Sequence, residues 1–159
     1  MPMAPRTALA FAAWVLFSAQ VGATGLLDGK SFEGMIGPVE KPDLADELFF
    51  EDGHFWSDIC TRCGFMPGEY LAEETKDGIA FSGTLESETR GRFAYSGLVR
   101  QDGSIRVSIQ WERRRWYWTS RREIVFIGDR NRPHDIELEA IHQRVERSDP
   151  DQNPACARF

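Results

Sequence analysis

The chain has 159 residues and a formal net charge of −6. That length is sufficient for one domain with a sizeable core. The acidic balance argues against nucleic acid as a general partner, and against adsorption of the whole protein to an anionic membrane, because such binding requires a net basic face.

Residues 1–23 are predicted to be a secretory signal peptide. Arg6 supplies a positive start, the stretch from Thr7 to Val21 carries no charge, and Val21-Gly22-Ala23 forms a small-residue cleavage site. No other apolar run is long enough to cross a bilayer, so no membrane span is expected once the signal is removed. We therefore expect the mature protein in the periplasm or outside the cell.

After residue 23 we expect a β-barrel domain over residues 24–130, because apolar and polar residues alternate between glycine-containing turns. Asp52-Gly53, Asp77-Gly78 and Asp102-Gly103 predict hairpins, since glycine tolerates the positive φ of a tight turn. Strands are expected over residues 32–36, 48–50, 54–57, 69–75, 79–85, 91–100, 104–112, 116–119 and 124–127.

Several of these strands have one apolar face. Ile105, Val107, Ile109 and Trp111 alternate with polar residues, as in an antiparallel sheet with one solvated side. About eight such strands predict an all-β fold, an up-and-down antiparallel barrel in which closure removes the strand edges. A two-sheet sandwich is the alternative.

Residues 131–159 are predicted to form a C-terminal helix or tail. Asp135 is suited to cap a helix over residues 136–147, where Leu138, Ile141 and Val145 fall at helical spacing. A strand beginning at residue 136 is the alternative. Residues 148–159 are expected to be loose unless Cys156 ties them down.

The three cysteines are Cys60, Cys63 and Cys156. A structural disulfide is expected, joining Cys156 to Cys60 or Cys63, or joining Cys60 to Cys63. Thiol-redox chemistry at Cys60-x-x-Cys63 is an alternative, but it requires a helix N-terminus that Gly64 to Gly68 cannot supply. Zinc is another alternative, completed by His54, His134, His142 or Cys156, although no second ligand pair has matching spacing. We therefore expect no metal and no cofactor.

Residues 112–118 mix basic and aromatic side chains, as nucleic-acid or glycan surfaces do. We favour a hairpin tip with an exposed arginine cluster, followed by a strand whose Trp116 and Trp118 face the core. His54 is a candidate general base, but only Ser57 and Cys60 are local candidate partners, so no catalytic residue is assigned.

Several short stretches of the chain share a pattern with known proteins, in which a strand with Phe and Ser leads into a cysteine and then a Gly-Phe pair before a tyrosine. The matching residues are 27–34, 48–57, Cys60, Gly64, Phe65, Tyr70, Phe81, 91–93, Trp111 and 116–118. On these residues the chain resembles a poorly characterised group of exported bacterial proteins with a lipocalin-like (calycin-type) β-barrel. The resemblance implies a barrel, and by analogy with its fold a ligand site, but no activity.

These patterns predict a non-enzymatic exported barrel that binds a small apolar ligand in its mouth. An enzyme that uses Cys60 and Cys63 for thiol-redox or metal chemistry is one alternative. A structural or interaction protein of the cell envelope is the other, and it requires a dry interior and an exposed apolar patch. The expected ligand-binding residues are Phe93, Tyr95, Trp111, Trp116 and Trp118 inside the barrel, with His54 and Trp56 at the rim.

Overall fold

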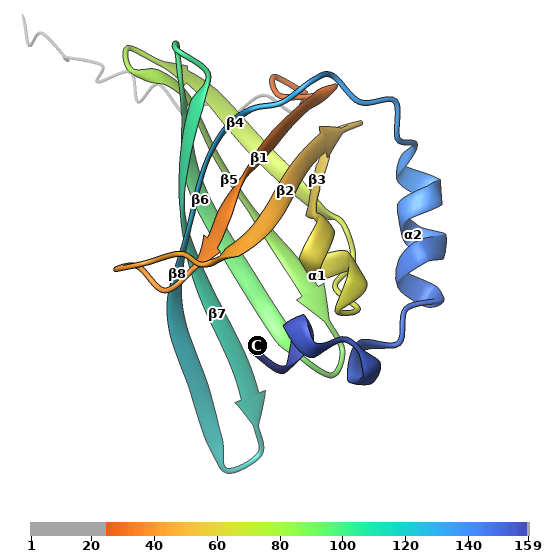
Figure 1. Cartoon of the computed structure of the whole chain (residues 1–159). Helices are drawn as coiled ribbons and strands as arrows, with labels where there is room; N and C mark the ends of the chain where they lie inside the picture. The colour runs from red at the N-terminus through yellow and green to blue at the C-terminus, as the bar shows by residue number, and fades with distance from the viewer. Residues whose placement is uncertain (1–24, 159) are drawn as a thin grey trace, which may run out of the picture.

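A computed structural model describes residues 25–158 (Figure 1). It is a closed barrel in which each strand pairs with the next along the chain and β8 returns to β1. The prediction of an all-β, eight-stranded, antiparallel up-and-down barrel is confirmed; the expected signal peptide lies outside the described residues. The strands are β1 Lys30–Gly37, β2 Leu44–Glu51, β3 His54–Ser57, β4 Gly68–Thr75, β5 Gly78–Ser87, β6 Gly91–Arg100, β7 Ser104–Arg115 and β8 Trp118–Arg130.

The three predicted Asp-Gly turns lie at one end of the barrel. At the β2–β3 turn, Asp52 has a φ of 49° and Gly53 a φ of 72°, the two positive values that a primed hairpin turn requires. This end also carries the turn over residues 25–29, whose Leu27 is fully buried. The hydroxyl of Tyr70 accepts from the Leu27 N–H at 3.0 Å and donates to Asp28 at 2.8 Å.

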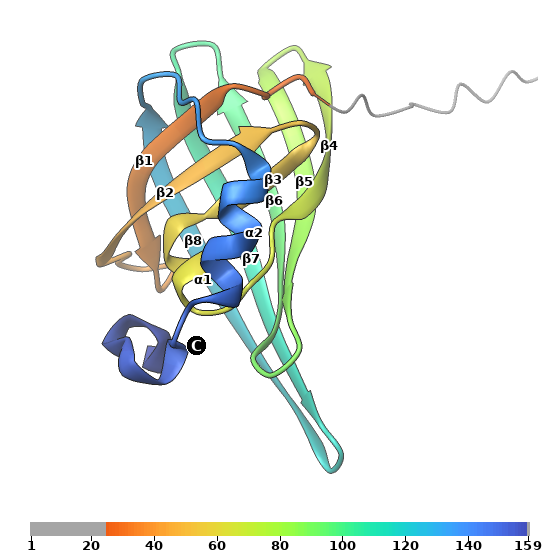
Figure 2. The same ribbon diagram turned by 90° about the vertical axis from the view of Figure 1, so that its right-hand side faces the viewer.

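The last two predicted strands are arranged differently from the expectation. Residues 116–119 do not form a strand of their own; β7 continues to Arg115, and β8 begins at Trp118. The reason is the register, in which Arg115 opposes Trp118 and the turn falls at Trp116 and Tyr117. This hairpin extends well beyond the rest of the barrel (Figures 1 and 2).

At the same end as that hairpin, a short helix α1 (Asp58–Arg62) follows β3. The C-terminal segment then crosses the outside of the barrel as α2 (Leu138–Glu146) and ends in two 3-10 turns, η1 (Pro150–Gln152) and η2 (Pro154–Arg158). The predicted helix is confirmed, with Ile141 and Val145 buried. Within residues 25–158, no helix combines the length and apolar character that crossing a membrane demands.

Two apolar clusters hold these layers together. The larger fills the barrel and includes Phe50, Phe55 and Phe81, and the rings of Phe50 and Phe81 are 5.1 Å apart between centroids. The smaller lies outside, where α2 covers β2 and β3 (Figure 2). Helical spacing thus gives α2 one apolar stripe, and that stripe packs on the outer face of the sheet.

Candidate functional site

The segment that carries Cys60 begins with a buried hydrogen-bond network. Ser57 caps α1 by accepting from the Cys60 N–H at 3.0 Å, and it donates to the Asp46 carboxylate at 2.6 Å. The other carboxylate oxygen of Asp46 accepts from the Ile59 N–H at 3.0 Å. Since Ser57 is fully buried and Asp46 nearly so, the network anchors α1 to β2.

Burial makes this network unsuited to nucleophilic chemistry. Desolvation raises the pKa of the Cys60 thiol to about 12, assisted by the nearby Asp46 carboxylate. Its contact with the Tyr95 hydroxyl is 3.5 Å, and burial also raises the pKa of Tyr95 well above its ordinary value. Reactive cysteines instead have depressed pKa values and partial exposure. Cys60 therefore has the environment of a structural cysteine.

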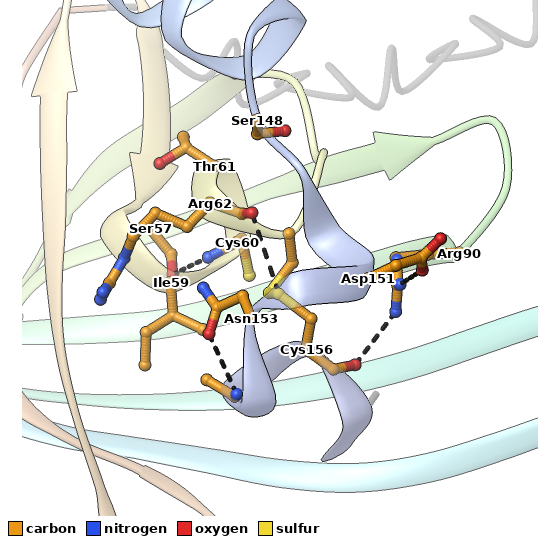
Figure 3. Close-up of a disulfide and its surroundings, with 12 residues drawn as sticks. Ser57, Ile59, Cys60, Thr61, Arg62, Arg90, Ser148, Asp151, Asn153 and Cys156 are labelled. Carbon is orange, nitrogen blue, oxygen red and sulfur yellow. Dashed lines mark hydrogen bonds and ion pairs between the residues drawn. A yellow bond between two sulfur atoms is a disulfide. The ribbon is translucent and has the colours of Figure 1, made fainter.

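The disulfide joins Cys63 to Cys156, with the two Cα atoms 5.3 Å apart, and leaves Cys60 as the free thiol (Figure 3). A disulfide was predicted, and this pairing is one of the alternatives that the spacing allowed. Cys60 and Cys63 consequently do not form a dithiol pair. Among residues 25–158, no group of three His, Cys, Asp or Glu side chains is placed to hold a metal ion.

His54 lies away from this segment. It occupies the far end of β3, beside the Asp-Gly turn, where its Nδ1 is 2.8 Å from the Asp52 carbonyl oxygen. Neither Ser57 nor Cys60 contacts it, because β3 carries them toward the opposite end of the barrel. The arrangement does not supply a nucleophile and base pair at His54.

The tail closes the end of the barrel at which α1 lies. Cys63 and Cys156 are both fully buried there. Arg90 donates to the Cys156 carbonyl oxygen at 3.0 Å and pairs with Asp151 at 2.8 Å (Figure 3). Arg122 donates to the Arg158 carbonyl oxygen at 2.7 Å. The tail, predicted to be loose unless Cys156 held it, is therefore fixed.

Three of the seven predicted ligand-binding residues point into the barrel. Phe93, Tyr95 and Trp111 are buried in the large cluster, where Phe55 and Tyr95 are 5.0 Å apart between ring centroids. The Trp111 indole N–H donates to the Arg90 carbonyl oxygen at 3.1 Å. The rings of Phe93 and Tyr95 also contact each other and other aromatic rings of the core.

Glycines let the aromatic rings approach the barrel wall. A Cβ atom on Gly83 would lie 2.4 Å from the Phe55 ring, and one on Gly97 would lie 2.4 Å from the Phe81 ring. Both distances are shorter than any van der Waals contact, so the rings occupy the space beside the glycines. These contacts indicate a closely packed interior.

Trp56 is also placed differently from the expectation of a rim residue. It is fully buried on the outside of the barrel beneath α2, where it stacks on Phe49 at 5.4 Å between centroids. His134 packs edge-on against both rings. Strand alternation sends Phe55 inward and Trp56 outward, so Trp56 contributes to helix packing.

The prediction that Trp116 and Trp118 face the core is wrong. Trp116 is 95% exposed, Tyr117 61% and Trp118 48%. Their exposure follows from the missing neighbours: β6 last pairs with β7 at Glu112, and β1 pairs with β8 only from Val125 onward. Residues 113–120, here called the β7–β8 tip, therefore form a two-stranded ribbon beyond the last β6 pair.

The outer surface is also hollowed beside the tip. An open groove of about 1450 Å³ runs over the outward faces of β4, β5 and β6 and reaches Arg113 and Arg114. Polar residues such as Ser82 and Thr84 line the groove together with apolar residues such as Leu71 and Ala94. The groove is open to solvent, and it adjoins the arginines of the tip.

Together these features define a closed eight-stranded β-barrel with a packed interior, a disulfide-fixed tail and an exposed basic and aromatic tip. No family model, curated protein or solved structure matches the chain. Its function is therefore inferred from its own residues.

Sequence reasoning missed two features of this arrangement. No sequence pattern singles out Asp46, because its burial beside Ser57 depends on pairing between β2 and β3. Tyr117 was not separated from its neighbours, although it shares the exposed turn with Trp116. The Arg-Arg-Arg-Trp-Tyr-Trp run was the signal for the tip, and its exposure could be read only once the barrel had closed.

Proposed function

We propose that this protein is an exported, non-enzymatic interaction protein of the cell envelope that docks through the β7–β8 tip. The near-complete exposure of Trp116 carries the proposal. Tryptophan is usually well buried, and contiguous exposed aromatic residues mark binding surfaces. Here three consecutive aromatic residues are held away from the barrel on a ribbon.

Three further observations support a binding role. The buried aromatic cluster occupies the barrel, which favours the outer tip over an inner cavity as the binding surface. The buried Cys60 thiol with its raised pKa argues against thiol catalysis. The Cys63–Cys156 disulfide is compatible with an oxidising compartment and therefore with the export predicted from residues 1–23.

The lipocalin-like resemblance is supported at the level of the eight-stranded barrel. A small apolar ligand among Phe93, Tyr95 and Trp111 stays a prediction. It would require these buried side chains to move apart, and the disulfide-fixed tail covers the end of the barrel near them.

Export and docking can be tested in one experiment in a bacterial host. The full chain is produced with its own N-terminus, and the cells are separated into cytosolic, periplasmic and envelope fractions. The mass of the protein in each fraction is then measured by mass spectrometry. We expect a mass corresponding to residues 24–159, carrying one disulfide, mainly in the envelope fraction. An intact N-terminus in the cytosol would contradict export.

The matched variant combines Trp116→Asn, Tyr117→Gly and Trp118→Thr. Asn-Gly is a favoured two-residue hairpin turn, so the ribbon is expected to persist without its aromatic residues. We expect this variant to move to the periplasmic fraction with its disulfide intact. A folded variant that stays with the envelope as firmly as the unaltered protein would overturn the proposed docking surface.

A further inference from the structure

We infer that the partner of the β7–β8 tip is the surface of an anionic phospholipid bilayer, into whose interface Trp116, Tyr117 and Trp118 insert. This inference rests on the proposed function and names the partner of that same surface. The argument uses the charge of the tip, its aromatic turn, the distribution of arginines over its two faces and its reach.

The tip is basic in a chain that is acidic as a whole. Residues 113–120 contain three arginines and no acidic residue, although the chain carries a net charge of −6. At the base of the tip, Glu112 lies opposite Arg121 in the register of β7 and β8. The net charge predicts that the protein as a whole avoids anionic surfaces. The tip is the exception, because its local charge is positive.

The three arginines of the tip are available to an external partner. The two arginines below the tip are already engaged, because Arg121 pairs with Glu112 at 2.9 Å and Arg122 lies over the Trp111 ring at 5.6 Å. Arg113, Arg114 and Arg115 make no ion pair with the part of the chain that the structure describes. Each arginine brought near an anionic lipid surface contributes about 1 kcal/mol of attraction.

The turn of the tip holds two aromatic residues, Trp116 and Tyr117, in place of the residues that favour a tight hairpin turn. Asp52 is the only described non-glycine residue with a positive φ, so neither Trp116 nor Tyr117 has the backbone of a primed turn. Local turn preference therefore does not account for two aromatic residues here. Tryptophan and tyrosine concentrate at membrane–water interfaces, where the ring meets the acyl boundary and its polar group meets the headgroups.

The free arginines lie on both faces of the ribbon. Arg115 opposes Trp118 on one face, whereas Arg114 opposes Thr119 on the other, because side chains alternate along a strand. A flat protein surface laid against the ribbon would contact only one of these faces. A bilayer interface surrounds an inserted tip, so it can use basic residues on both faces together with an apolar end.

The reach of the tip matches the depth of the interface. From Arg113 to Trp116 is three residue steps, or about 10 Å of extended strand. Surface-bound amphipathic segments bury their apolar face by about 5–10 Å at the headgroup boundary. The exposed aromatic turn can therefore reach that boundary while the arginines stay among the headgroups.

The test uses the mature, disulfide-bonded protein and sedimented lipid vesicles. One set contains phosphatidylglycerol mixed with phosphatidylcholine, and the other contains phosphatidylcholine alone. One variant carries Arg113→Gln, Arg114→Gln and Arg115→Gln, and a second carries Trp116→Ser, Tyr117→Ser and Trp118→Ser. The matched control carries Arg100→Gln, Arg106→Gln and Arg130→Gln, three exposed arginines from strands of the same barrel outside the tip.

We expect the unaltered protein and the control to bind anionic vesicles, with binding weakened by salt. Removing the three tip arginines should lower the partition coefficient roughly a hundredfold. The aromatic variant should also bind weakly, and brominated acyl chains should quench tryptophan fluorescence of the unaltered protein. Circular dichroism and disulfide mapping establish that each variant is folded.

The inference is overturned if the unaltered protein binds neither vesicle, binds both equally, or loses as much binding in the control as in the tip variants. If vesicles are not bound but the variant with Trp116→Asn, Tyr117→Gly and Trp118→Thr still leaves the envelope fraction, the docking surface stands and its partner is a protein or glycan. If that variant stays in the envelope, the proposed function itself fails.

Discussion

Cys63 and Cys156 are joined across 93 positions of sequence and are both fully buried at one end of the barrel. The bond connects the end of α1 to η2, so it fixes the tail against the core cluster to which both cysteines belong. It also explains why a segment with two prolines and many polar residues has a defined position.

Removing this bond with Cys63→Ser and Cys156→Ser should lower the free energy of unfolding. A loop of this length is worth about 4–5 kcal/mol in the chain-entropy model, and measured losses are about 2–5 kcal/mol. Urea unfolding measures the loss, and limited proteolysis should cut first within residues 147–158. Cys60→Ala is the control, with its disulfide intact and its tail protected. Equal protection of the tail in both variants would contradict this account.

Cys60 should not react with thiol reagents while the protein is folded. Burial raises its pKa to about 12, so the thiolate is scarce at pH 8 and the sulfur is covered. A colorimetric thiol assay should detect no reactive thiol in the native protein and one after denaturation without reductant. Rapid labelling of the native protein would restore the redox interpretation of Cys60.

Asp46 should make the protein less stable as the pH rises from 4 to 7. Burial raises the pKa of Asp46 from 3.8 to about 6, against the opposing hydrogen bonds from Ser57 and Ile59. The folded protein therefore holds this proton more tightly than the unfolded chain. This proton contributes about 3 kcal/mol to the free energy of unfolding. The contribution is fully present below pH 3.8 and is lost as the pH rises through about 6.

The Asp46→Asn variant measures this contribution. The unaltered protein should lose stability between pH 4 and pH 7, whereas the variant lacks this titrating group. The free energy of unfolding of the variant should therefore rise relative to that of the unaltered protein over this range. Ser57→Ala is the companion variant. Losing the α1 cap should cost about 1 kcal/mol, and losing the hydrogen bond that holds down the pKa of Asp46 should make the pH dependence steeper. A difference between Asp46→Asn and the unaltered protein that does not change with pH would argue against a buried, titrating carboxyl.

Gly97→Ala should test how tightly the barrel is filled. A Cβ atom there would lie 2.4 Å from Phe81 Cε1 and 3.0 Å from Val107 Cγ2, so the ring must shift. Such overpacking typically costs about 1–3 kcal/mol, measured by urea unfolding. Ser96→Ala, on the outward face next to it, should change stability by less than about 0.5 kcal/mol. No cost at Gly97 would indicate spare volume inside and favour the inner ligand site.

Much of the fold could be read from local pattern. Period-two alternation and the Asp-Gly pairs predicted the hairpins because a strand exposes alternate faces and a tight turn needs positive φ. Helical spacing of Leu138, Ile141 and Val145 predicted α2 for a similar reason. Each of these signals concerns residues close together in the chain.

The sequence by itself determined which residues share a face, where the three Asp-Gly turns fall and that a disulfide was expected. Only the tertiary structure decided that Cys63 is the partner of Cys156, that Trp56 lies beneath α2 and that Trp116 and Trp118 lie in solvent. Alternation divides a strand into two faces but does not say what covers either one. That depends on where β6 and β1 stop pairing and where the tail crosses, which are contacts between distant parts of the chain.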